Sequence, residues 1–127
     1  MEVLITLDTK PRALALLYYF VSENEKWIKA NDPGFDLMAS PIVYSNCCYG
    51  NWDFINQVIK NGKGDCVELS TILCAQLRCA GIPATIRVLD LSPELSHVQV
   101  VSQGRVIDPS VAKGMPYNPN DTRMFRL

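Results

Sequence analysis

One cysteine of this chain occupies a position where a thiol can act as a nucleophile. Residues 62–68 read Gly-Lys-Gly-Asp-Cys-Val-Glu, so Cys66 falls in the first turn of a predicted helix. The unpaired backbone N–H groups and the dipole at a helix start stabilise negative charge, which favours the reactive thiolate and lowers the pKa of a thiol. The same N–H groups are suited to hold the oxyanion of a tetrahedral intermediate. A buried cysteine at a capped helix start is the alternative interpretation of this segment.

His97 is the only imidazole in the chain, so any cysteine–histidine pair must use it. If residues 103–104 (Gln-Gly) form a two-residue hairpin loop, Ser102 pairs with Arg105 and Gln99 pairs with Asp108. Side chains alternate along a strand, so Asp108 should lie diagonally across from His97, at a Cβ separation of roughly 6–8 Å. The spacing predicts a carboxylate that orients the imidazole, as thiol enzymes require. A histidine at a strand start also fits a purely structural role.

The elements that must position these side chains follow from hydrophobic periodicity and turn residues. We expect a weak strand at 3–7, an extended piece at 42–44, helices near 10–30, 51–61 and 65–80, and strands at 85–89, 97–102 and 105–108. Asn51 is the predicted cap of the second helix, and Gly81 is the predicted left-handed residue after the third. The tail after Pro109 is expected to lack regular structure. Without a linker or repeat, residues 1–127 are expected to form a single domain.

The composition limits the classes of function. The chain has 127 residues with a formal net charge of −1, and no segment interleaves basic and aromatic residues, which argues against nucleic-acid binding. No apolar run approaches the ~18 residues of a membrane span, and the first residues lack the features of a secretory signal, so a cytoplasmic location is expected. Five cysteines, an odd number, argue against a disulfide framework. With a single histidine and no Cys-x-x-Cys pair, we expect neither a metal nor an organic cofactor.

Four segments in order resemble the transglutaminase-like superfamily, which has a papain-like fold. They are Gly-Asp-Cys-Val-Glu at 64–68, Leu-Arg-Cys-Ala-Gly-Ile-Pro-Ala at 77–84, His-Val at 97–98 and Ile-Asp-Pro-Ser at 107–110. The resemblance covers about residues 44–111. It implies an α+β fold with helices packed on a small antiparallel sheet and the nucleophile at a helix N-terminus.

By the same resemblance, Cys66 is the nucleophile, His97 the general base and acid, and Asp108 its orienting partner. The implied activity is that of an amide hydrolase or acyltransferase (a peptidase, deamidase or transglutaminase-like enzyme) acting on a protein or peptide. Two features depart from the family pattern: residues 98–100 lack an aromatic, and the interval from His97 to Asp108 is short. The alternative is an inactive module of the same fold that serves in a larger assembly, such as a viral particle.

Other polar and aromatic residues near these motifs have plainer interpretations. Asp65 and Glu68 are expected to interact with the helix dipole, and Gln99 is expected to be a solvated strand residue. The two tryptophans are expected to pack in the core. The adjacent cysteines at 47–48 could border a cleft or form a redox pair, although nothing in their spacing requires either.

Overall fold

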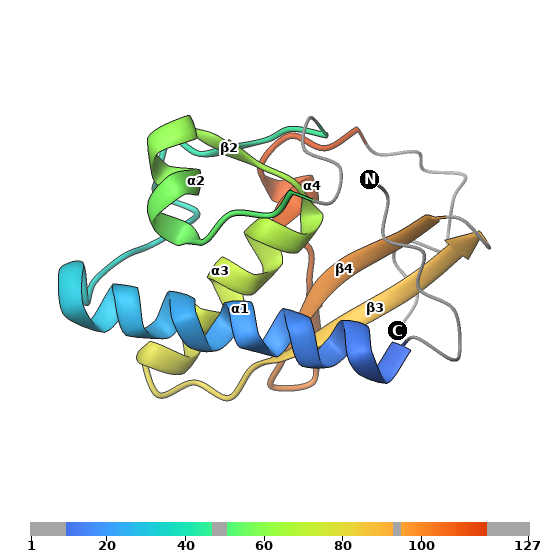
Figure 1. Cartoon of the computed structure of the whole chain (residues 1–127), viewed down its shortest axis with the longest axis horizontal. Helices are drawn as coiled ribbons and strands as arrows, with labels where there is room; N and C mark the ends of the chain where they lie inside the picture. Colours follow the sequence, from blue (N-terminus) through green and yellow to red (C-terminus); the bar gives the residue numbers. More distant parts are fainter. Residues whose placement is uncertain (1–9, 47–50, 93–94, 117–127) are drawn as a thin grey trace.

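The computed structural model describes residues 10–46, 51–92 and 95–116. In these ranges helices combine with a small antiparallel sheet, in agreement with the predicted fold class (Figure 1). In chain order the elements are α1 (Lys10–Asn31), β1 (Val43–Tyr44), α2 (Ile55–Asn61), β2 (Lys63–Gly64), α3 (Cys66–Cys79), β3 (Thr85–Ser92), β4 (Leu95–Ser102), β5 (Arg105–Ile107) and α4 (Pro109–Ala112).

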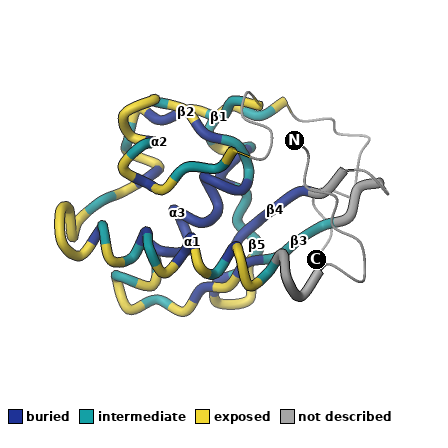
Figure 2. The backbone as a smooth tube through the Cα atoms, in the orientation of Figure 1, coloured by how far each residue is buried: buried dark blue, intermediate teal, exposed yellow. Residues whose placement is uncertain are grey.

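Helix α3 is the central element of the core and packs against both α1 and β4. Every residue from Val67 to Ala75 is buried, and the helix is correspondingly dark in Figure 2. A helix buried on all sides must satisfy its polar side chains inside the protein. Asn24 of α1 is one such partner, because its Nδ2 donates to Thr71 Oγ1 at 3.5 Å, and its Oδ1 also accepts from the backbone N–H of Ile55 in α2 at 2.9 Å.

The apolar faces predicted for the first two helices are the ones that the fold buries. Leu17, Val21 and Ile28 of α1 are buried, as are Ile55 and Val58 of α2. These side chains form one hydrophobic cluster with the apolar residues of α3 and β4. Burial of that cluster fixes α3, and therefore its first residue, relative to the rest of the chain.

The sheet has the order β3-β4-β5, with both pairings antiparallel. Ser102 pairs with Arg105 and Val100 with Ile107, so the predicted hairpin register is confirmed. Gln103 (φ 53°) and Gly104 (φ 76°) both adopt left-handed backbone conformations, as a two-residue primed turn requires. The conformation of Gln103 is uncommon for a residue other than glycine, asparagine or aspartate.

A short parallel pair, β1 with β2, was not predicted from the sequence and lies directly before α3. Its last residue, Gly64, is buried, and a Cβ there would stand 3.2 Å from Glu68 Cβ and 3.3 Å from Val58 Cγ1. The missing side chain therefore allows the chain to approach α3 closely just before Cys66.

Two predicted boundaries were wrong. Helix α2 begins at Ile55 with Phe54 at the cap position, not at Asn51, and the Phe54 side chain makes no capping hydrogen bond. The tail after Pro109 was predicted to be irregular, yet its first residues belong to α4, which has Pro109 in its first turn and the Asp108 side chain accepting from Val111 N. A capping aspartate and a proline at the first helical position are both standard signals for a helix start.

The predicted strand at 3–7 and the cysteines at 47–48 lie outside the described residues. Helix α3 ends as predicted, with Gly81 at φ 78° and the N–H of Ile82 donating to the Leu77 carbonyl oxygen at 2.9 Å. Among the helices in the described ranges, none is both long enough and apolar enough to cross a membrane.

Candidate active site

Cys66 is the first residue of α3, and a reciprocal capping box fixes the backbone on either side of it. The Asp65 side chain accepts from Glu68 N at 2.9 Å, and Glu68 Oε1 accepts from Asp65 N at 3.1 Å. These bonds satisfy donors that a helix start otherwise leaves unpaired. The Asp-x-x-Glu spacing is a sequence signal for a capping box. Asp65 and Glu68 were expected only to interact with the helix dipole, so this role was missed.

Glu68 also links α3 to the segment before α2. It is 2% exposed, and its Oε2 accepts from the backbone N–H of Asp53 at 2.8 Å. Burial is the main reason that the pKa of Glu68 rises to about 7, with the Asp65 and Asp53 carboxylates adding to the effect. The indole of Trp52, a half-buried residue of the same segment, hydrogen-bonds the Asp65 carboxylate. Asp65, the residue before Cys66, is therefore held from two chain segments.

The surroundings of the Cys66 thiol raise its pKa, whereas the sequence predicts a lowered one. Burial, together with the negative charges of Asp65 and Asp108, raises the pKa of the thiol to about 12. Hydrogen bonding from the backbone at Val98 and Val67 opposes this rise without overcoming it. The prediction of a lowered pKa was wrong because it counted the helix end but not desolvation and the two carboxylates.

His97 and Asp108 form the closest polar contact of the candidate site. His97 Nε2 lies 2.7 Å from Asp108 Oδ2, and their side chains are only 4% and 8% exposed. The predicted diagonal contact across the hairpin is therefore present. Burial tends to raise the pKa of Asp108, but the hydrogen bond and charge of His97, with the bonds from Gln99 and Val111, give a net lowering.

Asp108 connects the histidine to two further groups. Gln99 Nε2 donates to Asp108 Oδ2 at 3.1 Å, and Val111 N donates to Asp108 Oδ1 at 3.3 Å. Gln99 is fully buried, so its interpretation as a solvated strand residue was wrong. It faces the same side as His97, as strand alternation requires, but that side of β4 is covered by protein rather than by solvent.

A buried hydrogen bond joins the helix that carries Cys66 to the strand that carries His97. Ser70 Oγ donates to the Val98 carbonyl oxygen at 2.9 Å. The structure therefore brings the first turns of α3 next to β4. Asp108 is close enough for its negative charge to raise the pKa of the Cys66 thiol. No hydrogen bond between Cys66 Sγ and the His97 ring is present in the described part of the chain, so the predicted separation of about 3–4.5 Å stays a prediction.

Two further cysteines of α3 are described by the structure. Cys74 is buried in α3, and Cys79 Sγ contacts the Glu25 carbonyl oxygen at 3.6 Å. Among the described residues, no group of three or more His, Cys, Asp or Glu side chains is arranged to hold a metal ion. The reactive groups that the described residues do bring to this region are the Cys66 thiol and the His97–Asp108 pair.

The fold thus places a cysteine at the start of a buried helix and a histidine–aspartate pair on the adjoining hairpin. The family model of the transglutaminase-like superfamily matches residues 35–105, which is more than half of the chain, and the chain belongs to this superfamily. Searches of curated proteins and of solved structures found no match.

Proposed function

We propose that this protein is a cysteine-dependent amide hydrolase or acyltransferase, with a protein or peptide as substrate and the cytoplasm as its place of action. Cys66 is the nucleophile, His97 the general base and acid, and Asp108 the residue that orients His97. The observation that carries the proposal is the buried 2.7 Å contact between His97 Nε2 and Asp108 Oδ2, next to the helix start that bears Cys66.

The raised pKa of Cys66 selects one form of the mechanism. Since the resting thiol is protonated, His97 must take its proton as the sulfur attacks the carbonyl carbon, and no preformed thiolate is available. With Nε2 directed at Asp108, Nδ1 is the nitrogen that serves as the base. The carboxylate of Asp108 then stabilises the imidazolium ion.

Collapse of the tetrahedral intermediate expels the amine, which takes its proton from His97, and leaves an acyl thioester on Cys66. Water then releases the acid, or a second amine forms a new amide, and His97 accepts the proton from either nucleophile. The backbone N–H groups at the start of α3 are the candidates for binding the oxyanion. We favour hydrolysis, because a small domain offers little surface for selecting a protein amine over water.

The test uses an activated acyl donor, because the natural substrate is unidentified. The full chain is incubated with p-nitrophenyl acetate, and acetylation of each cysteine is followed by peptide mass spectrometry between pH 6 and 9. We expect a thioester to form first at Cys66, to disappear on addition of hydroxylamine, and to form at least tenfold more slowly in His97→Ala. Cys79→Ala is the matched control and should leave the rate at Cys66 unchanged.

If Cys66 reacts no faster than the half-exposed Cys79, and His97→Ala has no effect, the enzymatic proposal is wrong. The second candidate is then a module of the same fold that does little chemistry and contributes to a larger assembly, such as a viral particle. The observation in its favour is the pKa of about 12 for Cys66, which is far from that of a prepared thiolate.

A further inference from the structure

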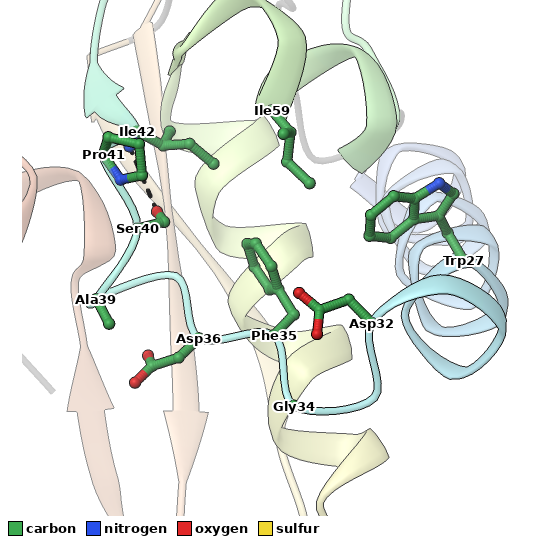
Figure 3. Close-up of a pocket in the computed structure, with 10 residues that line it drawn as sticks. All are labelled: Trp27, Asp32, Gly34, Phe35, Asp36, Ala39, Ser40, Pro41, Ile42 and Ile59. Atoms are coloured by element: carbon green, nitrogen blue, oxygen red, sulfur yellow. Dashed lines mark hydrogen bonds between the residues drawn. The ribbon is translucent and has the colours of Figure 1, made fainter.

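A cavity of about 460 Å³ lies between the end of α1, the loop that follows it and α2. Trp27 comes from α1, Asp32 and Phe35 from the loop, and Ile59 from α2, and these four side chains surround the same space (Figure 3). The cavity is within the usual volume of ligand pockets. None of its lining residues belongs to the set of Cys66, His97 and Asp108.

The walls of this cavity are largely apolar and partly aromatic. Trp27 and Phe35 are half-buried and approach the space from different sides, with Ile59, 39% exposed, above them in the view of Figure 3. Aromatic faces attract cations as well as apolar groups, and a guanidinium can stack on them. The walls therefore suit a group that combines an apolar stem with a positive charge.

The charge on the cavity is negative. Asp32 and Asp36 line it, whereas no Lys, Arg or His does. In the described part of the chain neither carboxylate forms a salt bridge, and Asp36 instead accepts from Met38 N at 3.1 Å. Figure 3 shows the Asp32 carboxylate between Phe35 and Trp27, whereas that of Asp36 points away from them.

The end of α1 adds to this negative potential. Asp32 directly follows the last residue of the 22-residue helix, where the dipole and the last carbonyl oxygens favour a cation. Lys113 also reaches the region, but its ammonium donates to the Ser40 carbonyl oxygen at 2.8 Å and does not line the cavity. The cavity thus has two exposed carboxylates, aromatic sides and no cation of its own among its lining residues.

We propose that this cavity binds a basic side chain of another polypeptide, with the cation at Asp32 and the aliphatic stem between Trp27, Phe35 and Ile59. Arginine is favoured over lysine, because its planar guanidinium can stack on an aromatic ring while donating two hydrogen bonds to one carboxylate. The site is independent of the chemistry proposed for Cys66, so failure of either proposal leaves the other standing.

The experiment is a titration of the ¹⁵N-labelled full chain at pH 7, observed by two-dimensional NMR. The probes are the N-acetyl amides of arginine, lysine, norleucine and glutamate, which share a backbone and differ in charge. We expect saturable shifts for arginine, and weaker ones for lysine, at the Trp27 indole N–H and at the amides of Gly34 and Phe35. Asp32→Asn should weaken arginine binding at least fivefold, whereas Glu23→Gln, which removes a carboxylate of α1 that does not line the cavity, should not change it.

The spectra also report whether each variant is folded. Trp27→Leu retains an apolar wall without the aromatic face, and it should abolish the preference for arginine over norleucine. Equal binding of norleucine and arginine to the wild type would show an apolar pocket without cation recognition and would overturn the proposal. Shifts that stay linear at all concentrations, or that persist unchanged in Asp32→Asn, would overturn it as well.

Discussion

The hydroxyl of Ser70 donates a 2.9 Å hydrogen bond to the carbonyl oxygen of Val98, and both residues are buried. Ser70 lies about one helical turn after Cys66, and Val98 directly follows His97 in β4. This bond therefore ties the helix that carries Cys66 to the strand that carries His97, in addition to their apolar packing.

Ser70→Ala should affect both stability and reactivity. Removing the donor should lower the free energy of unfolding by about 1–2 kcal/mol, because a buried carbonyl oxygen loses a partner. It should also slow acetylation of Cys66, because α3 can then shift relative to His97. Ser102→Ala is the matched control, since Ser102 Oγ also donates to a carbonyl oxygen, that of Pro83 at 2.7 Å, near the other end of β4. Urea unfolding should show a loss of stability, and acetylation of Cys66 should be slower in Ser70→Ala than in Ser102→Ala. An equal loss of acetylation rate in both variants would contradict this account.

Asp108→Asn should separate the structural role of this residue from its chemical role. An asparagine oxygen can still accept from Val111 N and cap α4, so the fold should persist. Its amide nitrogen, however, would donate to His97 Nε2 and force the ring proton onto Nδ1, which could then no longer accept the thiol proton. We expect acetylation of Cys66 to fall tenfold or more while the far-ultraviolet circular dichroism spectrum is unchanged. A rate equal to that of the wild type would remove Asp108 from the proposed mechanism.

Glu68 should make the protein less stable as the pH rises toward neutrality. Burial raises its pKa from 4.5 to about 7, so between these values the folded chain keeps a proton that the unfolded chain has lost. The free energy of unfolding should therefore fall as the pH rises from about 4.5 to about 7, by a contribution on the order of 3 kcal/mol, and then level off.

The measurement is urea unfolding at several pH values for the wild type and for Glu68→Gln. Glu68→Gln loses one hydrogen-bond acceptor, which lowers its free energy of unfolding by the same amount at every pH. The wild type should be the more stable protein at low pH, and this advantage should shrink or reverse toward pH 7. Glu23→Gln, a surface carboxylate that pairs with Lys26, controls for the removal of one negative charge. A difference between wild type and Glu68→Gln that is independent of pH would show that Glu68 does not titrate in this window.

Gly64→Ala should destabilise the protein by roughly 1–3 kcal/mol, the range for a methyl group forced into a packed interior. The new Cβ would stand 3.2–3.4 Å from atoms of Glu68, Val58 and Leu69, and two of these belong to the helix that begins at Cys66. Gly34→Ala is the control, because nothing lies within 4 Å of its added Cβ. Thermal melts should show a lowered midpoint for Gly64→Ala alone, and similar midpoints would mean that α3 moves freely to accommodate the methyl group.

The contact between His97 and Asp108 could be predicted from the sequence because it depends on local rules. The Gln103–Gly104 turn sets the strand register, and side-chain alternation then places both residues on one face. The start of α3 is local in the same sense, since Asp65 and Glu68 carry its capping signal.

The properties that the sequence did not reveal depend on residues far apart in the chain. Gln99 was predicted to be solvated because strand alternation gives the face but not what covers it, and here Asp108 meets it. The pKa of Cys66 was predicted with the wrong sign for a related reason: burial depends on the whole fold. The start of α4 is a different case, because Asp108 and Pro109 carried the signal and the prediction overlooked it.

The neutral resting state of Cys66 has a consequence for the durability of the protein. Peroxides and other oxidants react with thiolates far faster than with thiols, and repeated oxidation of a catalytic cysteine is irreversible. A thiol with a pKa of about 12 is therefore protected from oxidation while it keeps its proton. It becomes vulnerable only when that proton is removed or the chain unfolds. The raised pKa of Cys66 thus limits its oxidation for as long as the protein stays folded.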